Sequence, residues 1–284
     1  MSLKRIDDIK ELERLAYEMR IEIIRMLGEA GSGHPGGSLS AIDMITALYF
    51  HTMRIDPKNP SWSDRDRFIL SKGHCCPALY AAMAYTGYFD KALLPTLRKL
   101  NSPLQGHPDR RFLPALDAST GSLGQGVSIG IGIAMAGKLD NKDYQTYVMV
   151  GDGESQEGQV WEAIMFAPFH KLNNLTLIVD NNGQQLDDFT DKILSLQPLP
   201  EKLKAFNWEV IEINGNDMAQ CVEALDRAKW NKTEKPVAIV ANTVKGYGVS
   251  FMEHQVKWHG VAPKPDEVKA AVKELEAKLQ ELGA

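Results

Sequence analysis

The chain has 284 residues, a length that fits one large α/β domain or a domain with an extension. Hydrophobic residues make up 44% and charged residues 24%, which is typical of a globular protein with a sizeable core. The net charge is −5 without a basic block, and no apolar run approaches the ~20 residues of a membrane span. The three cysteines form neither a disulfide framework nor a zinc-binding spacing. We therefore expect a cytoplasmic protein that binds neither nucleic acid nor a membrane.

Helical and strand patterns alternate along the chain. Apolar residues recur every three or four positions over residues 6–27, which predicts an amphipathic helix, and a second helix is expected at about 39–50. Five short apolar runs rich in β-forming residues predict strands at 67–71, 146–150, 175–180, 208–213 and 236–244. Helical patterns lie between most of them. This alternation predicts an α/β fold with a mostly parallel sheet and helices on both faces.

We assign residues 1–265 to this α/β domain and residues 266–284 to a C-terminal helix. The apolar residues of that helix follow a spacing of four and three, which resembles the narrow seam of a coiled coil. The seam could serve assembly, but packing against its own domain is the more ordinary role, and we expect that.

Polar and glycine residues follow every predicted strand. The turns contain Lys72-Gly73-His74, Gly151-Asp152-Gly153, Asn181-Asn182-Gly183, Asn214-Gly215-Asn216-Asp217 and Lys245-Gly246. Open parallel sheets bind ligands outside the carboxyl ends of their strands, so these residues gather where a ligand would lie. Glycine and asparagine also end strands for conformational reasons alone. One such turn means little, but five of them favour a binding site.

Asp152 and Asn182 are the strongest candidates for metal ligands. They are 30 residues apart, about one βαβ unit, so consecutive strands could bring them together. Carboxylate and amide oxygens suit Mg²⁺ or Ca²⁺, and a bound diphosphate would complete the coordination of the ion. A helix predicted to start after Gly153 would offer backbone N–H groups to that diphosphate. The glycines beside Asp152 would let the backbone approach it closely.

Four of the seven histidines stand next to a glycine in expected loops or strand ends: His34, His74, His107 and His259. A loop histidine is most often a solvated or capping residue. Four of them over one cavity would suit general acid–base catalysis and the binding of polyol hydroxyls. A zinc site of three histidines is the competing interpretation, but no short metal-binding motif supports it.

Six ordered segments resemble the N-terminal half of transketolase, from about residue 10 to residue 262. Gly151-Asp152-Gly153 followed by Asn181-Asn182 resembles the thiamine-diphosphate fingerprint, which many thiamine enzymes share. The other segments are SGHPGGSLSAIDMITALYF, DRFILSKGHCCPALYAAM, GHPD, STGSLGQGVSIGIGIAMAGKL and the late HG turn, and GDGESQEGQVWEA extends the fingerprint. The resemblance implies the thiamine-diphosphate-binding fold, in the form of its diphosphate-type domain.

The resemblance also implies a role for each matching residue. The metal ligands would be Asp152, Asn182 and the backbone carbonyl of Gln184. The contacts to thiamine diphosphate would come from His74, Gly121, Leu123, Gly153 and His259. The residues facing substrate hydroxyls and assisting proton transfer would be His34, His107 and His259. Glu157 matches an acid that the family places at its dimer contact, although an acid in the first turn of a helix is also favoured by the helix dipole.

The implied reaction is the transfer of a two-carbon ketol unit from a ketose phosphate to an aldose phosphate, as in the pentose phosphate pathway. It requires thiamine diphosphate and Mg²⁺ or Ca²⁺. The pyrimidine-binding domain of the family has no counterpart before Ala284. We therefore expect a separate subunit that carries this domain, a heterotetramer of the two chains with a homodimer as the alternative for this chain alone, and no activity without the partner.

Other functions remain open from the sequence. The chain could be half of an enzyme resembling deoxyxylulose-phosphate synthase, or of a transketolase for an unusual sugar. A metal-dependent phosphohydrolase could use Asp152, with Asp217 as the single candidate for a second acid. A regulatory subunit could have kept the cofactor pocket without catalysis.

Overall fold

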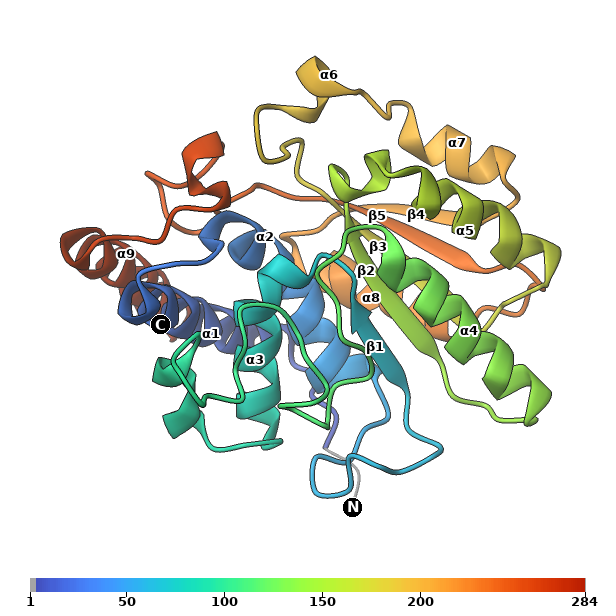
Figure 1. The fold of residues 1–284 in the computed structure, drawn as a ribbon, viewed down its shortest axis with the longest axis horizontal. Helices are drawn as coiled ribbons and strands as arrows, with labels where there is room; N and C mark the ends of the chain where they lie inside the picture. The colour runs from blue at the N-terminus through green and yellow to red at the C-terminus, as the bar shows by residue number, and fades with distance from the viewer. Residues whose placement is uncertain (1–3, 284) are drawn as a thin grey trace.

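The computed structural model describes residues 4–283 as an α/β fold around one parallel sheet (Figure 1). Its five strands are β1 (Arg67–Leu70), β2 (Thr146–Gly151), β3 (Leu175–Asn181), β4 (Glu209–Asn214) and β5 (Val237–Asn242). Their order in the sheet is β1-β2-β3-β5-β4, and every neighbouring pair is parallel. All five predicted strands form, and each lies within two residues of its predicted bounds.

The sequence of each strand matches its place in the sheet. Strands β2, β3 and β5 are buried along nearly their whole length, which is why they read as continuous apolar runs. Of the two edge strands, β4 alternates between buried and exposed residues, whereas β1 is mostly buried.

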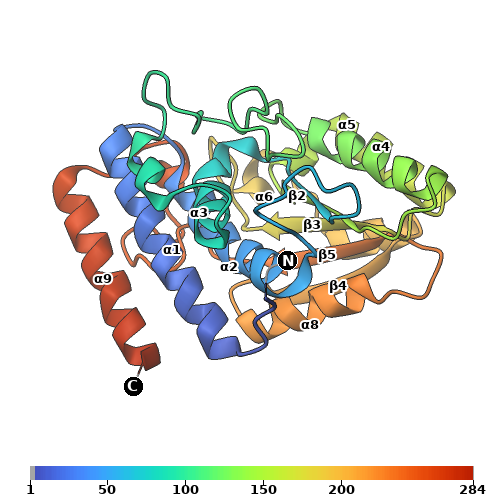
Figure 2. The same cartoon turned by 90° about the horizontal axis from the view of Figure 1, so that it is seen from below.

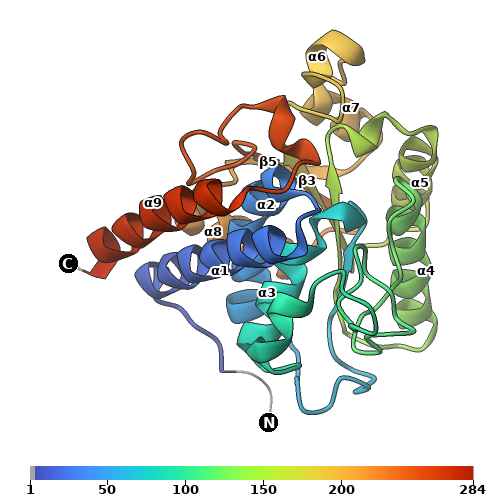
Figure 3. The ribbon, with the colours of Figure 1, turned by 60° about the vertical axis from the view of Figure 1, so that its left-hand side comes forward.

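Helices cover both faces of the sheet, as Figures 2 and 3 show. One face carries α1 (Ile9–Ala30), α2 (Pro35–Ala47), α3 (Cys76–Thr86), α8 (Met218–Lys229) and α9 (Pro265–Gly283). The other face carries α4 (Gln125–Leu139), α5 (Gly158–Phe169) and α7 (Leu199–Ala205). The short α6 (Thr190–Ile193) stands off from the sheet (Figure 1). None of the helices within residues 4–283 is long and apolar enough to cross a membrane.

The second helix begins earlier than predicted. Helix α2 starts at Pro35 instead of residue 39, and it continues into a π-helical turn, η1 (Leu48–Thr52). Proline fits the first turn of a helix because the N–H that it lacks would have no partner there. His34 therefore stands directly before the helix, at its N-cap position.

The C-terminal helix packs on its own domain, as expected. Helix α9 lies along α1 (Figure 2), with Ala271 and Leu275 fully buried. Val268 fits against Gly28 of α1 so closely that a Cβ atom at Gly28 would lie 2.4 Å from its Cγ2. The apolar seam is thus part of the core.

Candidate active site

A cavity of about 300 Å³ lies at the carboxyl ends of the strands. All eleven site residues expected from the sequence line it: His34, His74, His107, Gly121, Leu123, Asp152, Gly153, Glu157, Asn182, Gln184 and His259. They come together because β2 and β3 are adjacent and parallel, and because the loops around them reach the same edge of the sheet.

Asp152 is a buried acid with an unused oxygen. Its Oδ2 accepts the backbone N–H of Gly183 at 2.8 Å and the hydroxyl of Thr190 at 3.3 Å. Its Oδ1 is buried and has no hydrogen-bond partner among the described residues. Burial, together with the nearby charge of Asp180, raises the pKa of Asp152 to about 6. Such a carboxylate lacks a counter-charge, and a cation would supply one.

Asn182 and Gln184 add further oxygen atoms beside Asp152. The Asn182 side chain donates from Nδ2 to Asp180 at 3.0 Å, and its carbonyl oxygen accepts the N–H of Gln184 at 3.2 Å. The backbone carbonyl of Gln184 accepts from the Lys245 ammonium at 3.3 Å. This donor set of a carboxylate, an amide and a backbone carbonyl is hard and suits Mg²⁺ or Ca²⁺.

Two glycines keep the cavity open. A Cβ atom on Gly153 would lie 2.6 Å from Cβ of Gln185, so no larger residue fits there. Gly121 has a φ of 144°, which side chains rarely adopt. The segment after Gly153 differs from the prediction: it forms a short 3₁₀ turn, η4 (Glu154–Gln156), and α5 begins only at Gly158. A helix therefore does begin directly after Gly153, but it is a single 3₁₀ turn and not the start of α5.

The four loop histidines form one cluster in the cavity. The ring centre of His34 lies 5.1 Å from that of His74, 5.6 Å from His259 and 6.2 Å from His107. Burial lowers the pKa of all four side chains, to about 4 for His34 and about 3 for His259. The charge of Arg98 lowers the pKa of His34 and His107 further, and that of Lys245 lowers the pKa of His259. At neutral pH they are uncharged. Within residues 4–283, no three His, Cys, Asp or Glu side chains are arranged to hold a metal.

Two buried lysines complete the site, and the sequence analysis assigned neither of them a role. Lys72 donates to Asp180 and, at 3.3 Å, to the carbonyl of Gly37. Lys245 contacts Nδ1 of His259 at 2.7 Å and makes no ion pair with the described acids. Burial lowers the pKa of Lys245 to about 8, so it is still mostly charged at pH 7. The one sequence feature that could have identified these lysines as site residues is their position, because each directly follows a predicted strand.

The outer edge of the cavity meets a strongly apolar surface. Leu123 is 37% exposed, and Glu157 is exposed at the start of α5. From there, the outward faces of α4 and α5 present several large apolar side chains: Ile129, Leu139, Met165, Phe166 and Phe169. Polar side chains are few on both helices, although α5 also exposes Glu162. Apolar surface of this kind marks an interaction site.

Comparison with known proteins agrees with this geometry. Residues 12–281 match the family model described as "Transketolase, thiamine diphosphate binding domain". The chain belongs to the transketolase family. It is 44% identical over 276 residues to the 6-deoxy-6-sulfo-D-fructose transketolase subunit SqwG of Clostridium sp. (strain MSTE9), covering 97% of this chain and 98% of that protein. It is 38% identical to one subunit of the apulose-4-phosphate transketolase of Phocaeicola vulgatus, covering 96% of this chain and 97% of that protein.

The single-chain transketolases are longer. Human transketolase is 37% identical over 96% of this chain, which corresponds to 43% of the human protein. The crystal structure of transketolase from Campylobacter jejuni superposes with a TM-score of 0.88 and 32% identity, covering 97% of this chain and 46% of that one. The chain thus corresponds to less than half of these transketolases and to nearly the whole of the subunits.

The second acid that the sequence offered for a phosphohydrolase, Asp217, lies elsewhere. Asp217 does not line the cavity but caps helix α8, where its carboxylate accepts the N–H of Gln220 at 3.1 Å. A role as the N-cap accounts for this residue fully.

Proposed function

We propose that this chain is the diphosphate-binding subunit of a two-chain transketolase that uses thiamine diphosphate and a divalent metal. The supporting observation is a buried oxygen of Asp152 that has no partner among residues 4–283 and lies in the same cavity as Asn182 and Gln184. The cavity also contains Lys245, which pairs with none of the acids in that range. A metal with a diphosphate would satisfy both the acid and the lysine. The family model supports the cofactor, and Mg²⁺ or Ca²⁺ follows from the donor set.

Different residues would bind the metal, the diphosphate and the aminopyrimidine. Asp152, Asn182 and the carbonyl of Gln184 would bind the metal, and Lys245, His74 and the open backbone at Gly153 would bind the diphosphate. Gly121 and Leu123 would contact the aminopyrimidine from the outer side of the cavity. When bound, thiamine diphosphate supplies the carbon nucleophile and electron sink that ketol transfer requires.

The neutral histidines would take a proton from the sugar and later return it. His34, His107 and His259 line the cavity and are uncharged at neutral pH. His34 and His107 can therefore accept a hydrogen bond from a substrate hydroxyl, whereas His259 accepts from Lys245 at Nδ1 and would donate to the substrate from Nε2. As the bond between carbons two and three of the ketose breaks, the hydroxyl on carbon three must lose its proton. One of these imidazoles takes that proton and returns it when the new ketose forms.

The substrates we propose are an anionic ketose as donor and an aldose phosphate as acceptor. A ketose phosphate of ordinary carbohydrate metabolism fits this description. A less common sugar is the second candidate, because the similar subunits are named for a sulfonated fructose and for apulose 4-phosphate. We expect the reaction to take place in the cytoplasm.

The partner would be a separate subunit with the pyrimidine-binding domain. Two similar proteins that this chain matches over nearly their whole length are named as subunits, whereas it matches only 43% of human transketolase. The apolar faces of α4 and α5 adjoin the open side of the cavity at Leu123 and Glu157, so a partner that covers them would also close the site. Two copies of each chain would form the assembly, with Glu157 at the contact between them.

Reconstitution tests this function. The purified chain is mixed with a separately expressed chain that carries the second half of a transketolase, and ketol transfer is followed with thiamine diphosphate and Mg²⁺ or Ca²⁺. We expect activity only in the mixture, and a large loss with His107→Ala but not with His254→Asn, an exposed histidine that does not line the cavity. Robust activity of this chain alone would refute the two-chain proposal. Unchanged activity of His107→Ala would instead indicate a regulatory subunit.

A further inference from the structure

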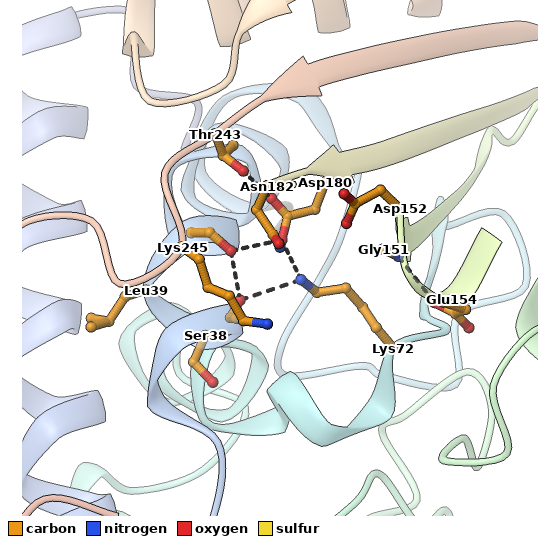
Figure 4. A network of polar contacts seen from close by, with 12 residues as sticks. Ser38, Leu39, Lys72, Gly151, Asp152, Glu154, Asp180, Asn182, Thr243 and Lys245 are labelled. Atoms are coloured by element: carbon orange, nitrogen blue, oxygen red, sulfur yellow. Dashed lines mark hydrogen bonds and ion pairs between the residues drawn. The ribbon is translucent and has the colours of Figure 1, made fainter. Parts of the chain in front are cut away.

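Asp180 is a fully buried carboxylate at the end of β3, and four side chains donate to it. Ser40 donates at 2.7 Å and Asn182 at 3.0 Å, and the other two donors are Lys72 and Thr243. These residues come from α2 and from the loops after β1, β3 and β5. Figure 4 shows Asn182, Thr243 and Lys72 around Asp180, with Asp152 beside them. One carboxylate thus joins four segments directly behind the cavity.

The contact with Asp180 determines which end of the Asn182 amide faces the acid. The two ends of an asparagine amide have nearly the same shape, but one accepts hydrogen bonds and the other donates them. An ionised carboxylate can only accept. The end of Asn182 that faces Asp180 must therefore be its NH₂ group, and its carbonyl oxygen is turned to the other side, where it lies 3.2 Å from the N–H of Gln184.

Within the described part of the chain, Asp180 is surrounded by donors alone. Besides Asn182, its oxygens accept the ammonium of Lys72 and the hydroxyls of Ser40 and Thr243, so the carboxylate acts only as an acceptor. Because the acid remains an acceptor, the orientation of the Asn182 amide is fixed before any ligand arrives.

We propose that Asp180 is a positioning residue for the metal: it turns the carbonyl oxygen of Asn182 toward the ion and so sets the metal affinity of the site. The proposal rests on the proposed function, because Asn182 must be a metal ligand. Asp180 itself does not line the cavity and would touch neither the metal nor the cofactor. Its effect passes through the side chain of Asn182.

The variant Asp180→Asn removes the constraint. An amide at position 180 offers both a donor and an acceptor, so the Asn182 amide can face it with either end. We expect the affinity for Mn²⁺, measured by electron paramagnetic resonance at saturating thiamine diphosphate, to fall about 10- to 100-fold, the usual effect of losing a partner of a metal ligand. The matched control is Ser40→Ala, which removes a donor to the same oxygen of Asp180 without touching Asn182, and it should change Mn²⁺ affinity by less than about threefold.

A charge-conserving exchange separates positioning from folding. In the double variant Asp180→Asn/Asn182→Asp, the residue at 182 presents an oxygen in either orientation, and the number of acids is unchanged. We expect Mn²⁺ affinity to return to the wild-type value or better. If the single variant does not fold, the Mn²⁺ affinity of the double variant, compared with that of the wild type, is the test. A folded double variant that still binds Mn²⁺ weakly would overturn the proposal, as would a single variant with wild-type affinity.

The wild-type protein distinguishes this inference from the proposed function. If it binds neither Mn²⁺ nor thiamine diphosphate, the proposed function itself fails, and Asp180 has no metal ligand to position. If it binds both, and Asp180→Asn binds Mn²⁺ equally well, only the role of Asp180 is refuted. Neither measurement depends on catalytic activity.

Discussion

The variant Asp152→Asn should stabilise the metal-free protein while it abolishes the response to metal. Asp152 is buried, its Oδ1 has no partner among the described residues, and its pKa is raised from 3.8 to about 6. A raised pKa means that the folded protein holds this proton more tightly than the unfolded chain does. Stability is therefore lost as the pH rises between these two values, and the whole loss is present at pH 8.

The magnitude follows from the shift. A difference of roughly two pKa units corresponds to about 3 kcal/mol at 1.36 kcal/mol per unit. An amide at this position keeps an acceptor for the N–H of Gly183 but loses the added strength of a charged acceptor, which costs about 1 kcal/mol. The net gain in the free energy of unfolding is about 2 kcal/mol, or a rise in Tm of roughly 5 °C for a protein of this size.

The assay is thermal unfolding at pH 8 with EDTA, then with Mg²⁺ and thiamine diphosphate. In EDTA, Asp152→Asn should melt above the wild type. With both ligands at about 100 times their dissociation constants, the wild type should gain about 2.7 kcal/mol from binding and the variant almost nothing. A variant that melts at or below the wild-type temperature in EDTA would refute the reasoning that the ionised acid is costly in the empty site.

Three further predictions concern the frame of the site. The carboxylate of Glu154 accepts the N–H groups of Gly124 at 2.9 Å and Gly151 at 3.1 Å. In Glu154→Gln the amide offers one acceptor fewer, so the free energy of unfolding measured by urea titration should fall by about 2 kcal/mol. Because the pKa of His34 is about 4, the unfolded chain binds more protons between pH 4 and 6.5, and stability falls as the pH drops through this range. The loss of stability as the pH drops should be shallower in His34→Gln than in the wild type. Equal slopes in the two proteins would contradict the lowered pKa of His34. Finally, Phe169→Ser on exposed α5 should leave Tm within about 1 °C but weaken binding to the partner chain, by isothermal titration, by roughly tenfold; an unchanged dissociation constant would exclude this face from the interface.

The sequence was sufficient to predict the sheet and the edge at which the site lies. Buried parallel strands leave continuous apolar runs, and the turns that follow them are rich in glycine and polar residues, so both can be read without a structure. The proximity of Asp152 and Asn182 followed from one βαβ unit, and β2 and β3 are indeed paired in register. The place of β5 between β3 and β4 could not be predicted, because no local pattern records which strands become neighbours.

Asp180 shows why the rest of the site stayed hidden. In the sequence it is the last polar residue of a predicted strand, without a glycine beside it. Its partners Ser40, Lys72 and Thr243 are 140, 108 and 63 residues away, so the pattern around Asp180 contains none of them. The early start of α2 was missed for a local reason, since the proline that begins this helix was assigned to the preceding glycine-rich loop.

The distribution of charge in the cavity bears on substrate recognition. No arginine lines it among the described residues, and the two lysines that do are already engaged. Lys72 is paired with Asp180, and Lys245 lies against the carbonyls of Gln184 and Gln185 at the depth of the proposed metal. A bound diphosphate can reach these two lysines, but the far end of an anionic sugar would lie beyond the neutral histidines and out of their reach. This chain does offer one positive charge near that end, because Arg98 is close enough to His34 and His107 to lower the pKa of both, so we expect Arg98 to contribute to binding an anionic sugar.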